Sequence, residues 1–239
     1  MNAFSRTESL IGTENLDKIK SAKIAVFGVG GVGGFVVEAL ARSGVQNITV
    51  FDNDVVSESN LNRQIIATVG TIGKDKTELV KERVLSINPN ARVQTERVFY
   101  LPENAANYDL SVYDYIIDAV DTVSAKIEII MRAKASGVPV ISCMGTGGKL
   151  DLLSLKVADI EKTKGCPLAR VMRRELKSRG ISKVKTVFSE ETVQSAYECT
   201  DKKADGKVAP PSMIFVPAVA GLLIAKEVIT DIINKKEEL

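Results

Sequence analysis

A cluster of five glycines within seven residues, 28–34, constrains the fold of this chain more than any other feature. The apolar run 23–28 ends in the first of these glycines, and residues 35–42, just after the cluster, carry apolar positions at helical spacing. A second apolar run, 47–52, ends in an acid. This order predicts a strand, a tight turn, a helix and a parallel strand, joined by the right-handed crossover that nearly all such units have.

Strand-like and helix-like segments keep alternating along the rest of the chain. We expect strands at 92–98, 113–120, 138–142, 151–158 and 184–189, and helices at 77–87, 124–136, 167–179 and 212–234. The alternation predicts an α/β fold with a doubly wound, mostly parallel Rossmann-like sheet that binds ligands at the carboxyl ends of its strands. Because the rhythm changes after residue 148, we expect a Rossmann-like domain at 1–150 and a C-terminal sheet and helix extension at 151–239, with a polar loop at 190–211.

The chain contains no histidine, which excludes Ser-His and Cys-His nucleophilic catalysis and histidine-liganded metals. Its three cysteines, Cys143, Cys166 and Cys199, form no CxxC pair, which argues against a structural zinc. They could act as thioester or persulfide carriers. Since no adjacent residue would lower a thiol pKa, we expect ordinary buried or surface cysteines with no catalytic role.

The N-terminal residues show no basic region followed by an apolar run, so we expect a cytoplasmic protein. The apolar run 213–225 is too short to cross a hydrocarbon core of about 30 Å. It predicts a core or dimer-interface helix and no membrane insertion. A net charge of +2 argues against indiscriminate binding of polyanions by the whole surface.

The glycine cluster satisfies the GxGxxG pattern through Gly28, Gly30 and Gly33, with Gly31 as an additional glycine. Between a strand and a helix, such glycines allow backbone amides to approach a phosphate at the positive end of the helix. Asp52 ends the next strand, where a carboxylate can accept hydrogen bonds from ribose hydroxyls. Both NAD and ATP offer that ribose, so these residues leave the nucleotide open.

Two cations shortly after Asp52 favour ATP. Arg63 lies in SNLNRQ (59–64) and Lys76 in GKDK (73–76). A triphosphate carries about four negative charges, and displacing pyrophosphate requires cations on the β and γ groups, whereas a dehydrogenase has no terminal phosphate. The alternative is that both are solvated surface charges, as most arginines and lysines are.

Asp121 follows the strand expected at 113–120, within DAVDT (118–122). We expect its carboxylate at the carboxyl edge of the sheet, where it can hold Mg²⁺, an ion that binds through one or two acids plus substrate phosphates. The alternative is that Asp121 caps the helix that begins near Ser124. Both roles can coexist.

Together, these motifs resemble the ubiquitin-activating-like (ThiF-type) adenylating enzymes over about residues 5–150. The resemblance implies ATP and Mg²⁺ as cofactors, and a homodimer in which an N-terminal arginine, here Arg6, enters the neighbouring subunit's ATP site. It implies catalytic roles for Arg63, Lys76 and Asp121. The expected nucleotide-binding residues are Arg6, Gly28, Gly30, Gly31, Gly33, Asp52, Asp54, Asn60, Arg63, Gln64, Lys76 and Asp121.

The second half narrows the resemblance. CPLAR (166–170), RRELKSRGI (173–181) and VFSEE (187–191) are similar to segments of the tRNA threonylcarbamoyladenosine dehydratases. That family implies ATP-dependent ring closure of the threonylcarbamoyl group on tRNA adenosine 37, a homodimer, and an association of some members with sulfur-relay proteins. Two alternatives remain: adenylation of the C-terminus of a ubiquitin-like or sulfur-carrier protein, and a non-catalytic dinucleotide-binding sensor.

Residues 170–185 contain seven basic side chains and one acid. This density is typical of a surface that binds RNA phosphates, although such runs are often only a solvated helix face. The family resemblance favours tRNA. The expected RNA contacts are Arg170, Arg173, Arg174, Lys177 and Arg179.

Overall fold

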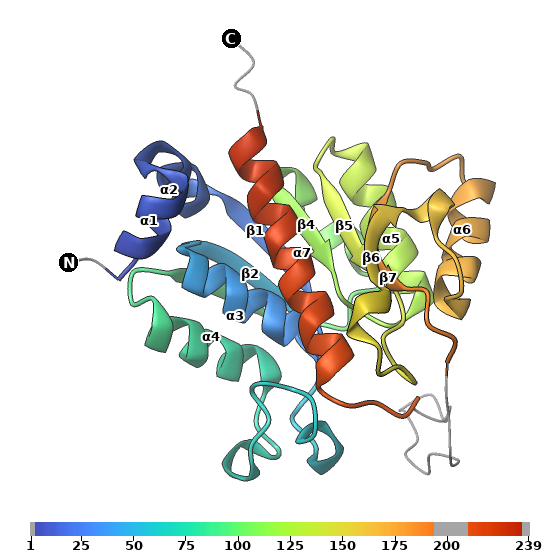
Figure 1. Ribbon diagram of the computed structural model, residues 1–239, viewed down its shortest axis with the longest axis horizontal. Helices are drawn as coiled ribbons and strands as arrows, with labels where there is room; N and C mark the ends of the chain where they lie inside the picture. The colour runs from blue at the N-terminus through green and yellow to red at the C-terminus, as the bar shows by residue number, and fades with distance from the viewer. Residues whose placement is uncertain (1–2, 194–209, 236–239) are drawn as a thin grey trace.

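A single seven-stranded sheet runs through the structure, a computed structural model that describes residues 3–193 and 210–235 (Figure 1). The strand order is β3-β2-β1-β4-β5-β7-β6, and every pairing is parallel except that of β6 with β7. The expected α/β, doubly wound, mostly parallel sheet is therefore confirmed. The strands are β1 (Lys23–Phe27), β2 (Asn47–Phe51), β3 (Arg92–Glu96), β4 (Tyr115–Asp118), β5 (Val140–Cys143), β6 (Leu155–Asp159) and β7 (Lys185–Ser189).

Helices cover both faces of the sheet because the buried strands present apolar side chains on alternate sides. Ile24 and Val26 of β1 belong to the core cluster on one face, whereas Ala25 and Phe27 belong to the cluster on the other. The first face carries α3 (Gly33–Ser43), α4 (Lys76–Ile87) and α7 (Phe215–Asn234), and the second carries α5 (Val123–Ala135) and α6 (Pro167–Ser178).

Several boundaries differ from the expected ones. The strand expected at 151–158 begins only at Leu155, because residues 152–154 form a 3₁₀ turn whose start is capped by the Asp151 carboxylate. The last helix begins at Phe215 and not at residue 212, and Pro217 lies in its first turn, where a backbone N–H has no intrahelical partner anyway.

Two short helices precede β1 and were not predicted: α1 (Ser5–Ile11) and α2 (Thr13–Ser21). Most of the loop expected at 190–211, including Cys199, lies outside the described residues. Within the described part of the chain, no helix combines the length and the apolar character needed to cross a membrane.

The C-terminal part of the chain continues the sheet and then returns to its centre. Strand β7 inserts between β5 and β6, and α7 crosses the face of the sheet beside α3 (Figure 1). The two helices approach closely at Gly221, where a Cβ atom would lie 2.5 Å from the Val32 carbonyl oxygen. Only a glycine fits this crossing without a backbone shift, so the start of α3 is held in place by the C-terminal helix.

Candidate active site

The turn between β1 and α3 is as tight as its glycines predict. Gly28 has a φ of +83°, and a Cβ there would lie 2.9 Å from the Ala119 carbonyl oxygen. A Cβ on Gly33 would lie 1.8 Å from the Gly28 carbonyl oxygen. A Cβ built on Gly30 or Gly31 would lie 3.6 or 3.5 Å from the nearest side-chain atom. The turn therefore packs Gly28 against the loop after β4, and the side chains of Gln64, Arg63 and Pro217 lie in van der Waals contact over its middle.

Asp52 ties this turn to the end of β2. One carboxylate oxygen accepts the Val29 N–H at 2.8 Å, and the other accepts the Asp54 N–H at 2.9 Å. Burial raises the pKa of Asp52, and the nearby Lys76 ammonium and these two N–H donors offset only part of that rise. Each oxygen keeps a second lone pair, so the carboxylate can still accept a hydroxyl donor.

Lys76 is a buried cation beside the carboxylates of Asp52 and Asp54. Its Nζ donates to Asp54 Oδ2 at 2.8 Å, and its side chain is only 5% exposed. The alternative of a solvated surface charge is therefore wrong for Lys76. The ammonium group lies at the start of α4, on the same edge of the sheet as the glycine turn.

Arg63 lies over the middle of the glycine turn. Its Cγ is 3.5 Å from where a Gly31 Cβ would lie, and its Nη1 donates to the Ser59 carbonyl at 2.6 Å and to Asn62 Oδ1 at 2.9 Å. Three of its five N–H donors can face a ligand once these two bonds are made. The structure thus brings the predicted arginine to the predicted glycines.

Gln64 and Asn60, in the same segment as Arg63 (59–64), differ in whether their side-chain oxygens are hydrogen-bonded. Gln64 is buried, its amide nitrogen is next to Gly30, and its Oε1 has no hydrogen-bond partner among the described residues. A buried unpaired acceptor is costly, so this oxygen is a polar group whose hydrogen bond the described residues do not supply. The Asn60 oxygen instead accepts the Ser57 N–H at 3.2 Å and caps the turn at 58–60.

Asp121 lies exposed in the loop after β4. Helix α5 begins at Val123, and Thr122 takes its N-cap position without a side-chain cap hydrogen bond. No group of three or more acidic or cysteine side chains that could hold a metal occurs in the described ranges. Such a site fits Mg²⁺ only as part of a complex in which nucleotide phosphates supply further oxygens.

Two buried residues next to Asp121 were missed in the sequence. Asp118 and Lys126 are both 0% exposed and form an ion pair at 2.9 Å. A signal was present, because Lys126 occupies the same helical stripe as Ile129, Ile130 and Ala133, all of which are buried.

Arg6 lies in α1, away from the glycine turn of its own chain. Phe4, two residues before Arg6, lies at the C-terminal end of α3. Its ring is 3.5 Å from the position that a Cβ on Gly44 would take. The glycine turn is at the other end of α3, which at 1.5 Å per residue is about 16 Å long. One copy of the chain therefore does not bring Arg6 to its own site.

The segment at 210–217 spans the same edge of the sheet, which the sequence did not indicate. Gly148, in the loop after β5, donates its N–H to the Pro211 carbonyl at 2.6 Å. Asn62 Nδ2 donates to the Ser212 carbonyl at 2.8 Å, and Pro217 packs against Gly31. This segment links the loop after β5 to the glycine turn, so it lies at the carboxyl ends of β1 and β5.

The basic run at 170–185 divides into separate groups. Arg173 donates Nη1 to the Thr163 carbonyl at 2.6 Å and to its hydroxyl, so it also fastens a loop. Arg174 and Arg179 each pair with Glu175 at 2.9 Å. The side chains of Arg170 and Lys177 are exposed and form no ion pair within the described part of the chain. They are the basic groups of α6 most available to an anionic partner.

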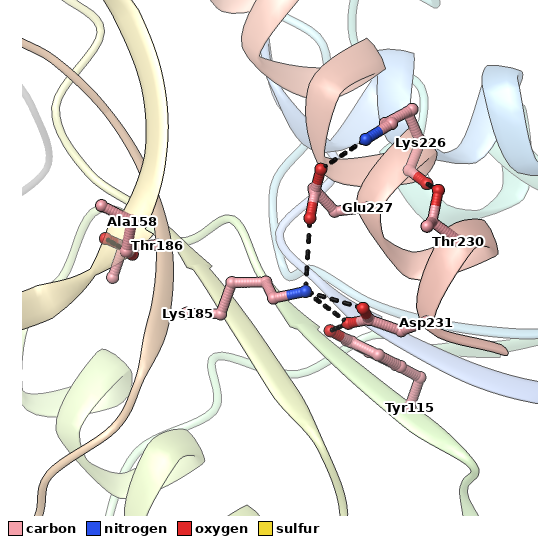
Figure 2. Close-up of polar contacts among 8 residues, drawn as sticks. All are labelled: Tyr115, Ala158, Lys185, Thr186, Lys226, Glu227, Thr230 and Asp231. Carbon is pink, nitrogen blue, oxygen red and sulfur yellow. Dashed lines mark hydrogen bonds and ion pairs between the residues drawn. The ribbon is translucent and has the colours of Figure 1, made fainter. Parts of the chain in front are cut away.

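Lys185, at the end of that run, belongs to an internal cluster and not to a basic surface. It lies at the start of β7, and its Nζ donates to both carboxylate oxygens of Asp231 at 2.7 Å and to Glu227 at 3.2 Å (Figure 2). Tyr115 donates its hydroxyl to Asp231 at 2.7 Å. This cluster fastens α7 to the amino ends of β4 and β7, the edge opposite the glycine turn.

Cys143 and Cys166 are both buried free cysteines. Burial raises the pKa of the Cys143 thiol to about 12. This thiol stays protonated at neutral pH, and a thiol is a much poorer nucleophile than a thiolate.

Comparisons with known proteins agree over the whole chain. The model of the ThiF family matches residues 4–239. A Bacillus subtilis (strain 168) protein named tRNA threonylcarbamoyladenosine dehydratase is 39% identical over 246 residues, which cover 99% of this chain and 97% of that protein. The protein of that name from Escherichia coli (strain K12) is 40% identical over 175 residues, 73% of this chain and 65% of that protein.

The solved structure of E. coli tRNA N6-threonylcarbamoyladenosine dehydratase, TcdA, in complex with ATP superposes with a TM-score of 0.88 at 34% identity. The match covers 97% of this chain and 94% of that one. It includes both the glycine turn and the C-terminal strands and helix, so the two chains share the complete architecture described above. The chain therefore belongs to the ThiF family.

Proposed function

We propose that this chain is an ATP-dependent tRNA threonylcarbamoyladenosine dehydratase, which activates the threonylcarbamoyl carboxylate on adenosine 37 and closes it into a ring. The observation that carries the proposal is the nearly full-length match to relatives of that name, one of them solved with ATP. The geometry supports it, because the glycine turn, Arg63, Gln64 and Lys76 meet at one edge of the sheet.

The first step is attack of the substrate carboxylate oxygen on the α-phosphorus of ATP, which breaks the bond to pyrophosphate and forms an acyl-adenylate. An ionised carboxylate needs no general base, which suits a chain without histidine. The main barrier is the approach of two anions. Arg63, Lys76 and the amides of the glycine turn lower this barrier by placing positive charge on the phosphates. Mg²⁺, held by Asp121 and the phosphates, would supply further positive charge.

The second step is attack of the carbamoyl group on the activated carboxyl carbon of the same substituent. It closes the ring and releases AMP and a proton, so the net change is loss of water driven by ATP cleavage. Because nucleophile and electrophile belong to one substituent, the protein mainly holds them in a reactive orientation and excludes water.

The nucleotide contacts extend this proposal. Asp52 and Asp54 receive the ribose side of ATP, and the unpaired Gln64 Oε1 accepts a nucleotide donor. Asn60 supports these contacts by holding the turn at 58–60. The family resemblance implies a homodimer in which Arg6 enters the site of the second copy, and the position of Arg6 away from the glycine turn of its own chain is compatible with that role. Because some members of the resembled family are associated with sulfur-relay proteins, we include such proteins as candidate partners, and we assign the chain to the cytoplasm, where a tRNA substrate is found.

ATP–pyrophosphate exchange tests the substrate. We expect exchange to depend on tRNA that carries open threonylcarbamoyladenosine and not on tRNA that lacks it. Mass analysis of nucleosides from a deletion strain should show loss of the cyclic form and accumulation of the open form. An unchanged nucleoside profile would contradict the proposal.

A second function, activation of a protein C-terminus, has one observation in its favour. A Mycobacterium tuberculosis (strain CDC 1551 / Oshkosh) relative named probable adenylyltransferase/sulfurtransferase MoeZ is 33% identical over 131 residues, although these are only 55% of this chain. Exchange driven by a diglycine-tailed carrier protein, with none driven by tRNA, would favour that function over ours.

A further inference from the structure

A fully buried ion pair lies directly behind the loop that carries Asp121. Asp118 is the last residue of β4 and Lys126 lies in the first turns of α5, and neither side chain is exposed. Removing two charges from water is costly, and their attraction compensates only when the remaining donors and acceptors are also paired. A neutral apolar pair would usually serve stability equally well. The pair therefore needs an explanation beyond packing.

The hydrogen bonds of this pair are directed at the loop between β4 and α5. Lys126 Nζ donates to Asp118 and also to the Val120 carbonyl at 2.9 Å. Asp118 Oδ1 accepts the Val120 N–H at 3.2 Å, so both polar groups of one loop residue are held. The other oxygen, Oδ2, accepts the Ser142 hydroxyl at 2.5 Å.

This arrangement determines the course of the backbone on both sides of Val120. With the Val120 carbonyl directed inward to Lys126, the next residue, Asp121, is carried to the exposed side of the loop. On the other side, the Ala119 carbonyl is pressed against Gly28, where even a Cβ would not fit. The same buried cation thus stabilises the loop that walls the glycine turn at Ala119 and carries Asp121.

We propose that Lys126 is a positioning residue that acts through Val120 to hold Asp121 against the metal–triphosphate complex, with Asp118 holding the lysine in place. The inference deepens the proposed function and rests on its assignment of Mg²⁺ to Asp121. Partners that orient a metal ligand from behind typically change metal affinity by about 10–100-fold when they are lost.

The test uses the full-length protein loaded with ATP and measures Mn²⁺ binding by electron paramagnetic resonance, beside thermal unfolding. Lys126→Met should weaken Mn²⁺ binding about tenfold or more, while ATP binding in EDTA changes much less. Because this variant leaves Asp118 buried without its cation, it can also unfold. The double variant Asp118→Asn, Lys126→Met is neutral and should recover stability but not Mn²⁺ affinity, since Val120 still lacks its donor.

Ser142→Ala is the matched control. It removes a buried hydrogen bond from the same carboxylate without touching Val120, so it should lower the unfolding temperature and leave Mn²⁺ affinity unchanged. Wild-type Mn²⁺ affinity in the double variant would overturn the proposal, as would an equal loss of affinity in Ser142→Ala. The measurement needs no tRNA, so a failure of the tRNA assignment would show separately, as Mn²⁺ and ATP binding without nucleoside modification.

Discussion

Lys76 is a lysine at a position that ordinary helix energetics disfavours. It is the first residue of α4, where the positive end of the helix dipole repels a cation. The Asp54 carboxylate at 2.8 Å and the nearby Asp52 offset this repulsion. A buried cation in such a place is suited to a site where a highly charged anion must be received.

We expect Lys76→Met to lower the rate of ATP–pyrophosphate exchange about a hundredfold or more, because the cation is removed from a partly desolvated site. Its ion-pair partner Asp54 is 58% exposed and can be hydrated after the change, whereas the buried Asp52 loses a nearby cation and its pKa should rise further. Lys74→Met is the control, because Lys74 is an exposed lysine two residues away. Equal losses in the two variants would argue against a specific role for Lys76.

Helix α6 shows how one basic run can serve two purposes. Arg170, Arg174 and Lys177 share one face, at spacings of four and seven residues, whereas Arg173 is engaged with Thr163. The Arg173 and Arg174 pair that looks most basic in sequence is thus the wrong pair to replace, because loss of Arg173 would disturb the fold as well as the surface.

The informative double variant is Arg170→Ala, Lys177→Ala. If both side chains neutralise tRNA phosphates, binding should weaken and the slope of log K against log salt should fall by about 1.4–1.8. Filter binding across a salt series would measure this slope. Lys23→Ala, Arg92→Ala removes the same charge from exposed positions at the amino edge of the sheet and should leave the slope unchanged.

Helix α7 is fastened to the sheet by the Lys185 cluster (Figure 2). Burial lowers the pKa of Lys185, but its bonds to Asp231 and Glu227 outweigh burial and raise it overall. Burial raises the pKa of Glu227, yet Lys226 and Lys185 lower it overall. The lysine contribution to stability is therefore present at neutral pH and lost as pH rises through its raised pKa. The glutamate contribution is lost as pH falls through its lowered pKa.

Lys185→Met should destabilise the protein by about 1–3 kcal/mol at pH 7, because Asp231 and Glu227 lose a charged donor. The difference from wild type should shrink as pH falls through the lowered pKa of Glu227, because the protonated carboxyl group no longer needs that cation. Urea unfolding at several pH values would measure it. ATP affinity should not change, since the cluster lies at the edge opposite the glycine turn; a large change would contradict this separation.

At the scale of the whole molecule, the C-terminal helix completes the nucleotide site that the first fifty residues begin. Gly221 allows α7 to cross the start of α3, and Pro217 packs beside Gly31. The site is therefore not a property of residues 1–150 alone, although the motifs for it all lie there.

We expect Gly221→Ala to lower both the stability of the protein and its affinity for ATP. A methyl group 2.5 Å from the Val32 carbonyl must push the two helices apart, at a cost of about 1–3 kcal/mol. Because Val32 belongs to the glycine turn, ATP affinity should fall as well. Gly70→Ala is the control, since nothing lies within 4 Å of a Cβ there. Calorimetric ATP titration and thermal unfolding would check both effects, and unchanged ATP affinity in a destabilised Gly221→Ala would contradict the coupling.

Much of the fold and of the nucleotide site could be predicted because their signals are local. Strand and helix periodicity appears within single segments, and the glycine turn must lie between a strand and a helix wherever the chain goes. Arg63 and Lys76 were found by the charge that a triphosphate demands. Residues whose role depends on a partner in a distant segment, such as Lys185, whose partner Asp231 is 46 residues away, could not be assigned in this way.

The sequence by itself determined the alternation of strands and helices and the handedness of the first crossover. It also determined which side chains stand at the carboxyl ends of β1, β2 and β4. These features follow from nearest-neighbour sterics and side-chain type. Only the tertiary structure decided that Lys126 holds the loop before Asp121, that Lys185 fastens α7 and that residues 210–217 link the loop after β5 to the glycine turn. These contacts join segments up to about 180 residues apart, and the free energy that selects them comes from packing and desolvation in the assembled core.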